Sequence, residues 1–134
     1  MTMPSSPQAR ILAIEDNTDT QVLLRYLLRS RYDIEIVPHV DDALDAAASN
    51  EYDLFLLDIN LGEERTGIDL LHELRKLERY RDTPAVALTA YAMPGDKERL
   101  EQAGFTGYLS KPFTRKELHG VIEEMLNRER STGE

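Results

Sequence analysis

Acidic, hydroxyl and basic residues follow the short apolar runs of the sequence, at positions where they could handle phosphate. Glu15 and Asp16 come directly after the first run, and Asp58 comes after another. Thr89 and Lys111 stand at the ends of two later runs. Three carboxylates and one ammonium group leave a net negative charge, and the carboxylates repel one another unless a cation binds between them. The set therefore indicates a cation site combined with phosphoryl chemistry.

The expected cation is Mg²⁺ or Mn²⁺, because the candidate ligands are hard carboxylate oxygens with no His or Cys nearby. The chain has no cysteine, and its three histidines lie away from these runs. Asp58 is the candidate nucleophile, since a carboxylate can take a phosphoryl group as an acyl phosphate. Lys111 would neutralise phosphoryl oxygens, and Thr89 would donate a hydrogen bond to one of them.

Apolar runs that alternate with helical segments must position these side chains. Residues 11–14 and 54–57 form continuous apolar runs, which are typical of strands buried on both faces of a parallel sheet. Residues 34–36 alternate between apolar and polar, as a half-exposed edge strand does. The remaining two predicted strands are 85–88 and 108–110.

Caps and periodicity predict five helices. Thr18 with Gln21 and Thr114 with Glu117 are capping boxes that open the first and last helices. The apolar face predicted for the first helix consists of Val22, Leu23, Tyr26 and Leu27. The apolar face predicted for the last helix consists of Leu118, Val121, Ile122, Met125 and Leu126. The other predicted helices are 41–49, 68–77 and 94–103, and we expect the third of these to be the most mobile because it has few apolar anchors.

Five strands alternating with five helices predict an α/β fold with a flavodoxin-like, doubly wound, five-stranded parallel sheet and helices on both faces. The continuous runs belong in the centre and the alternating run at an edge, which the strand order 2-1-3-4-5 satisfies. In such a sheet the binding crevice lies at the carboxyl ends of the strands. All five chemistry-bearing residues are therefore expected to converge there.

The 134 residues fit one domain. We expect a flexible segment at 1–9, a folded domain at 10–127 and a flexible tail at 128–134. The net charge of −9 disfavours direct nucleic-acid binding, because it opposes attraction to phosphates. No stretch has the pattern of a secretory or membrane-spanning segment, so we expect a cytoplasmic protein that does not insert into membranes.

Four motifs resemble the response-regulator receiver domain of two-component signalling. They are Glu15-Asp16-Asn17, Leu57-Asp58, Leu88-Thr89-Ala90 and Lys111-Pro112-Phe113. Their combined spacing is more specific than any single motif, and the similarity covers Arg10 to Asn127. The resemblance implies a receiver of the stand-alone, chemotaxis-regulator-like type.

The resemblance implies a role for each matching residue of the site. Asp58 would be the phosphoacceptor, and Thr89 and Lys111 would grip the phosphoryl group. The Mg²⁺ ligands would be Glu15 (directly or through water), Asp16, Asp58 and the backbone carbonyl of Asn60. In the family, the bond that corresponds to Lys111–Pro112 is commonly cis.

The resemblance also implies a signalling switch that assists its own phosphorylation and dephosphorylation, rather than an enzyme. A phosphohistidine on a histidine kinase or histidine phosphotransfer protein would be the donor. Tyr108 would turn inward when Thr89 moves toward the phosphoryl group, and the surface of the fourth helix, fifth strand and fifth helix would then control binding of a downstream protein. A monomer or weak dimer is expected.

The loop after the third strand departs from the family pattern. It reads Leu61-Gly62-Glu63-Glu64-Arg65-Thr66-Gly67. Gly62 stands where the family usually has proline, and the loop is one residue longer. This difference leaves open the partner contacts at the loop and the lifetime of the phosphoryl group.

Other functions remain open at this point. Asp58 could be the nucleophile of a phosphatase, although no long insertion supplies a substrate pocket or lid. The chain could also be an interaction module that does not use its site, or a receiver excised from a hybrid kinase. Taken alone, Glu15-Asp16 would be no more than a solvated helix start, since acids are favourable there.

Overall fold

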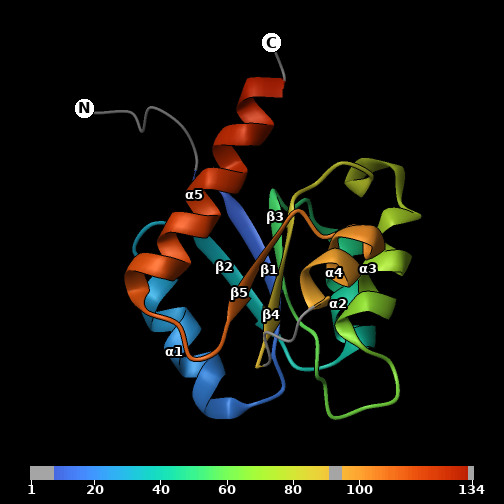
Figure 1. The fold of residues 1–134 in the computed structure, drawn as a ribbon, viewed down its shortest axis with the longest axis horizontal. Coiled ribbons are helices and arrows are strands. Elements are labelled where there is room, and N and C mark those ends of the chain that lie inside the picture. The colour runs from blue at the N-terminus through green and yellow to red at the C-terminus, as the bar shows by residue number, and fades with distance from the viewer. Residues whose placement is uncertain (1–7, 91–94, 133–134) are drawn as a thin grey trace.

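A parallel sheet with the strand order β2-β1-β3-β4-β5 is the centre of the computed structural model, which describes residues 8–90 and 95–132 (Figure 1). The strands are β1 (Arg10–Ile14), β2 (Asp33–Val37), β3 (Leu54–Asp58), β4 (Ala85–Thr89) and β5 (Gly107–Ser110). The predicted fold class and strand order are confirmed.

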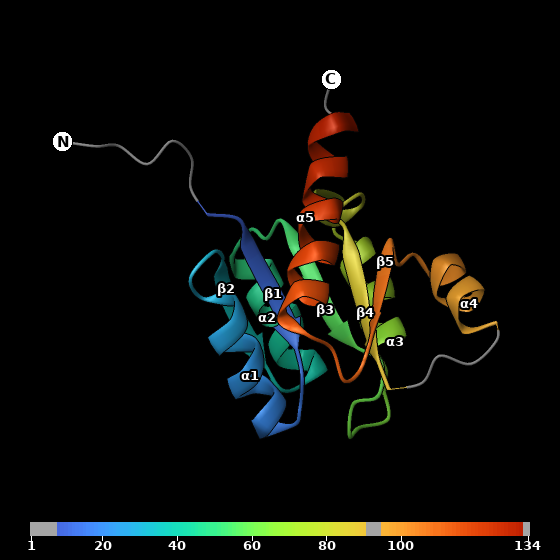
Figure 2. The ribbon, with the colours of Figure 1, turned by 60° about the vertical axis from the view of Figure 1, so that its left-hand side comes forward.

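Helices cover both faces of the sheet (Figures 1 and 2). One face carries α1 (Thr18–Leu28) and α5 (Arg115–Thr132). The other carries α2 (Val40–Ser49), α3 (Gly67–Arg75) and α4 (Asp96–Ala103). A short 3₁₀ turn, η1 (Glu78–Tyr80), precedes β4 and was not predicted. Its buried Tyr80 packs edge-on against Phe55 of β3.

Burial of the strands follows their hydrophobic patterns. Every residue of β3 is buried, and so is β1 from Ile11 onward, because both strands have neighbours on either side and helices on both faces. The alternating β2 is only partly covered and lies at the sheet edge, as predicted. The two continuous runs are therefore the strands that carry the central part of the core.

The start of α1 differs from the prediction. Asn17 is the N-cap, and its side-chain oxygen accepts a hydrogen bond from the backbone N–H of Thr20 at 2.9 Å. Thr18 is already inside the helix, and the Gln21 side chain donates to the backbone carbonyl of Glu15 instead of closing a capping box. The predicted box was wrong because Asn17 is an equally good cap one residue earlier.

The predicted apolar face of α1 is correct at Leu27 and wrong at its other three residues. The residues that pack on the sheet are Leu24, Leu27 and Leu28. Val22 and Tyr26 are 64% and 60% exposed, and Leu23 is exposed as well. Both sets of residues have helical spacing, and only the packing of α1 on the sheet selects one of them.

The last helix agrees with its prediction. Thr114 and Glu117 form the expected reciprocal bonds, from Thr114 N–H to the Glu117 carboxylate and from Glu117 N–H to the Thr114 hydroxyl. The predicted apolar face packs on the sheet, with Val121 partly buried. The helix continues to Thr132, past the predicted domain end at Asn127. The flexibility of 128–134 stays a prediction.

The fourth helix begins at Asp96, after Gly95 with a left-handed φ of 92°. The predicted start at Pro94 lies outside the described residues, as does most of the segment 1–9. Leu100 is the buried residue of α4, so its anchoring is as slight as the sequence indicated. Within 8–90 and 95–132, no helix combines the length and apolar character that crossing a membrane requires.

Candidate functional site

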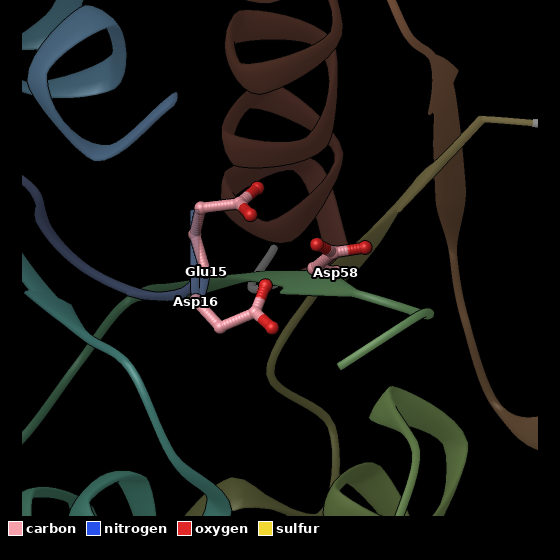
Figure 3. Close-up of side chains that lie close together, drawn as sticks. All are labelled: Glu15, Asp16 and Asp58. Carbon is pink, nitrogen blue, oxygen red and sulfur yellow. The ribbon is translucent and has the colours of Figure 1, made fainter. Parts of the chain in front are cut away.

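Three carboxylates meet at the carboxyl edge of the sheet. Glu15 and Asp16 follow β1, Asp58 ends β3, and one oxygen from each lies within 4.8 Å of the others. Figure 3 shows the three side chains reaching into the same space. Glu15 and Asp58 are only 1% and 4% exposed, whereas Asp16 faces solvent. Two of the three charges are therefore largely removed from water.

The strand register brings these residues together. Ile14 of β1 pairs with Leu57 of β3, so the residues that follow this pair, Glu15 and Asp58, lie side by side. Backbone amides then orient the carboxylates. The N–H of Asn17 donates to Glu15 Oε2, and the N–H of Asn60 donates to Asp58 Oδ1, both at 3.1 Å.

Lys111, which follows β5, contacts two of the three carboxylates. Its ammonium donates to Glu15 Oε1 at 2.8 Å and to Asp58 Oδ2 at 3.0 Å. The backbone N–H of Lys111 bonds to the carbonyl of Thr89 at 2.7 Å, at the ends of β5 and β4. The Lys111–Pro112 bond is cis, as the resemblance implied.

Burial and charge act in opposite directions on the two partners of this ion pair. Burial raises the pKa of Glu15, and the hydrogen bonds from Lys111 and Asn17 offset only part of that effect. For Lys111, burial by itself would lower the pKa. The hydrogen bonds to Glu15 and Asp58 and the charges of both acids outweigh burial, so the pKa of Lys111 is raised. Lys111 is therefore a firmly charged ammonium at neutral pH.

The acidic group fits a hard divalent cation. All of its candidate ligand atoms are carboxylate oxygens, two of the three residues are buried, and their charges exceed the one that Lys111 supplies. Mg²⁺ and Mn²⁺ prefer such oxygen donors. Asn60 lies two residues beyond Asp58, at the start of the same loop. The role of its carbonyl stays a prediction.

Thr89 lies on β4, which pairs with β3, and Tyr108 lies on the edge strand β5 beyond it. Thr89 ends β4 and is buried, with 8% of its surface exposed. Tyr108 of the edge strand β5 is 38% exposed, and the ammonium of Lys97 lies 5.9 Å from the centre of its ring. Tyr108 thus faces outward, on the side of α4.

Gly62 of the loop after β3 and Gly67, the first residue of α3, belong to the site and were not predicted to act there. The N–H of Gly62 donates to Asp16 Oδ2 at 2.8 Å. A Cβ on Gly67 would lie 2.4 Å from the carbonyl oxygen of Asp58, so only glycine fits there. The sequence signal for Gly62 was its departure from the usual proline, which by itself says nothing of a hydrogen bond.

Two pockets lie away from the acidic group. One, of about 680 Å³, is at the opposite edge of the sheet and is lined by Arg10 and Asp33 among others. The other, of about 310 Å³, lies between α4, β5 and α5 and has Leu100, Phe105 and Met125 among its lining residues. Neither is lined by Glu15, Asp16 or Asp58.

Known proteins resemble this chain in sequence. The family described as "Response regulator receiver domain" matches residues 11–123. The polar-differentiation response regulator DivK of Brucella ovis is 37% identical over 105 residues, which cover 78% of this chain and 85% of DivK. The histidine-protein kinase BarA of Shigella flexneri is 33% identical over 113 residues, but the match covers only 12% of BarA against 84% of this chain.

Solved structures resemble it in fold. The chemotaxis protein CheY4 of Vibrio cholerae superposes with a TM-score of 0.84 at 27% identity, covering 89% of this chain and 99% of CheY4. The receiver domain of the sensor histidine kinase PA1611 from Pseudomonas aeruginosa superposes with a TM-score of 0.81 at 36% identity, covering 90% and 98% of the two chains. That structure holds a magnesium ion in its active-site cleft. With the acidic edge, the fold and the match over 11–123 in agreement, the chain belongs to the response regulator receiver domains of two-component signalling.

Proposed function

We propose that Asp58 accepts a phosphoryl group from a phosphohistidine on a histidine kinase or histidine phosphotransfer protein. The observation that supports this role is the placement of the Asp58 carboxylate, buried beside two further acids and 3.0 Å from the Lys111 ammonium. A buried nucleophile with a fixed cation beside it favours group transfer over simple solvation.

The transfer exchanges one bond to phosphorus for another. A carboxylate oxygen of Asp58 attacks the phosphorus atom, and the P–N bond to the donor imidazole breaks. The imidazole nitrogen keeps the bonding electrons and takes a proton, and Asp58 becomes an acyl phosphate. Water later attacks that phosphorus and regenerates the carboxylate with release of inorganic phosphate. Lys111 would stabilise the negative oxygens in both steps.

Glu15, Asp16, Asp58 and the Asn60 carbonyl would hold Mg²⁺ or Mn²⁺. When bound, the metal supplies positive charge to the phosphoryl oxygens. The protein's own contribution is to fix the carboxylates. Two are oriented by the backbone amides of Asn17 and Asn60, and the third by the amide of Gly62.

The output of the switch would be the surface formed by α4, β5 and α5. A phosphoryl group on Asp58 offers the Thr89 hydroxyl a charged acceptor, and movement of Thr89 leaves room for the outward-facing Tyr108. Tyr108 also lines the pocket of about 310 Å³ between these elements, so its movement would reshape a surface that a downstream protein can bind. We propose that the domain acts as a monomer or weak dimer in the cytoplasm.

Intact-mass measurement after incubation with acetyl phosphate tests the proposal. The wild-type protein is expected to gain one phosphoryl group when Mg²⁺ is present and none when the metal is chelated. Asp58→Asn is expected to gain none while its circular dichroism stays that of the folded protein. Asp53→Asn is the matched control, because Asp53 lies at the opposite edge of the sheet, where it bonds the N–H of Arg10.

Labelling that persists in Asp58→Asn would refute Asp58 as acceptor. If the wild-type protein takes up no phosphoryl group from acetyl phosphate and also binds neither Mg²⁺ nor beryllofluoride, the switch is refuted and a phosphate-independent interaction module is favoured. Multiple turnover on small phosphate esters would instead indicate a phosphatase. Neither described pocket is lined by Glu15, Asp16 or Asp58, so neither would hold a substrate against the proposed nucleophile.

A further inference from the structure

The loop between β3 and α3 contacts the acidic site through a main-chain group. The N–H of Gly62 donates to Asp16 Oδ2 at 2.8 Å, across a sequence separation of 46 residues. Asp16 is the exposed member of the three carboxylates. Within the described residues no donor contacts its other oxygen, Oδ1, which therefore stays available to a cation.

Glycine at position 62 is not required by the backbone. The described glycines with positive φ are Gly95 and Gly104, so Gly62 has a conformation that other residues can adopt. The close neighbour is Asp16 itself, because a Cβ built on Gly62 lies 2.9 Å from Asp16 Oδ2. Glycine therefore lets the main chain approach the carboxylate closely enough for the N–H to reach it.

The same loop is tied to the start of α2. Glu63 Oε2 accepts the N–H of Val40, the first residue of that helix, at 3.2 Å. The N-cap residue His39 makes no side-chain cap bond, so Glu63 supplies the acceptor for a backbone N–H that the cap residue does not provide. Arg65 adds a hydrogen-bonded ion pair to Asp41 at 2.9 Å. These contacts hold the loop that carries Gly62 against the start of α2.

We propose that the Gly62 N–H is a positioning group for the metal site, which fixes the Asp16 carboxylate so that Oδ1 faces the cation. The inference rests on the proposed function, because it takes Asp16 as a metal ligand. A carboxylate can accept this hydrogen bond on one oxygen and bind a metal through the other. Loss of such an outer partner lowers metal affinity by about 10- to 100-fold in known metal sites.

Comparing Gly62→Pro with Gly62→Ala separates the effect of losing the hydrogen bond from the effect of adding a side chain. Both substitutions add a Cβ near Asp16 and restrict the loop, but proline alone removes the N–H. Mg²⁺ titrations followed by ¹H–¹⁵N NMR give the dissociation constant and report the fold in the same spectra. Gly62→Pro is expected to bind Mg²⁺ about tenfold more weakly than wild type. Gly62→Ala should stay within about twofold, since the exposed Asp16 side chain can shift slightly.

The outcomes are distinct. Equal weakening in both variants would assign the effect to crowding and overturn the proposal. Wild-type or tighter affinity in Gly62→Pro would overturn it as well. If the wild-type affinity itself is unchanged by Asp58→Asn, the ion binds elsewhere, and the proposed metal site fails rather than the role of Gly62.

A second measurement tests the bond without any metal. In the metal-free protein, the amide proton of Gly62 should resonate downfield and exchange slowly with solvent, because it is bonded to a carboxylate. Asp16→Ala removes the acceptor and should move that resonance upfield, whereas Asp69→Ala, in the capping box of α3, should leave it in place. If the chemical shift of the Gly62 amide proton does not change in Asp16→Ala, the hydrogen bond itself is refuted.

Discussion

Lys111 holds two buried carboxylates through one ammonium group. Glu15 and Asp58 would repel each other in a poorly hydrated space, and each accepts a hydrogen bond from Lys111. Removing one partner of a buried ion pair leaves an uncompensated charge, which costs far more than losing a surface pair. The ammonium is therefore part of the structure of the metal-free protein as well as a candidate for phosphoryl binding.

Lys111→Met keeps the length of the side chain and removes its charge. In EDTA we expect a loss of about 3 kcal/mol in the free energy of unfolding, measured by urea denaturation. Added Mg²⁺ should reduce the difference from wild type, because removing the ammonium leaves the site more negative, so the ion binds the folded variant more tightly and stabilises it more. Lys116→Met, at an exposed position, should cost less than about 0.5 kcal/mol. Equal losses in the two variants would mean that the ion pair contributes little.

Residue chemistry at the strand ends could be predicted from the sequence, and backbone geometry could not. Asp16, Asp58 and Lys111 follow apolar runs, and parallel strands bring such positions to one edge whatever the details of packing. The contact of Gly62 with Asp16 depends on the path of a loop, which no periodicity encodes. For the same reason the hydroxyl of Tyr80, which bonds the carbonyls of Ala47 and Asn50, gave no sequence signal.

At the scale of elements, α3 approaches β3 so closely that its first residue has no room for a side chain. A Cβ on Gly67 would lie 2.4 Å from the Asp58 carbonyl oxygen and 3.2 Å from the Cα of Ile59. Both neighbours are backbone atoms, so neither can move alone. The position of α3 and the position of the proposed phosphoacceptor are therefore linked.

Gly67→Ala should destabilise the fold by about 1–3 kcal/mol through overpacking, and should also slow labelling by acetyl phosphate because Asp58 is displaced. Gly120→Ala is the matched control, since a Cβ at this position in α5 meets nothing within 4 Å. It should raise stability by up to about 1 kcal/mol through helix propensity. Thermal unfolding and intact mass measure both effects. Unchanged stability in Gly67→Ala would show that the close approach relaxes without cost.

The helices show which buried faces can be predicted from hydrophobic periodicity and which cannot. The capping box of Thr114 and the face of α5 were predicted correctly, because one apolar stripe matches the helical period. In α1, two overlapping stripes match it, and Leu27 alone belongs to both. The sheet buries Leu24 and Leu28 with it and leaves Val22 and Tyr26 outside. Choosing between stripes requires the tertiary contact, which the local sequence does not contain.

For the whole molecule, the sheet connects the acidic edge to the α4–β5–α5 surface through β4. Thr89 ends β4, and β4 pairs with β5, which carries Tyr108 opposite Ala87. A change at Asp58 therefore has a short route to the proposed output surface, through one side chain and one strand pair. The strand order, which the sequence predicted from burial patterns, is what makes this route short.

Thr89→Ala should separate phosphorylation from its consequence. Asp58 should still take up a phosphoryl group, as intact mass will show, although more slowly because one hydrogen-bond donor is lost. The ¹H–¹⁵N shifts that phosphorylation or beryllofluoride causes in α4, β5 and α5 should shrink to less than about half of the wild-type values. Full-size shifts at Tyr108 and Leu100 in this variant would exclude Thr89 as the connection.

The contact of Gly62 with Asp16 also has a consequence for how such loops change during evolution. Glycine and proline codons differ at two bases, so a lineage that moves between them passes through alanine or arginine. Both intermediates keep the backbone N–H, although both place a Cβ 2.9 Å from the Asp16 carboxylate. The donor is lost only at the second base change. Lineages that carry either intermediate therefore keep the main-chain donor to the carboxylate, and the weaker metal binding that we expect arises only when proline appears.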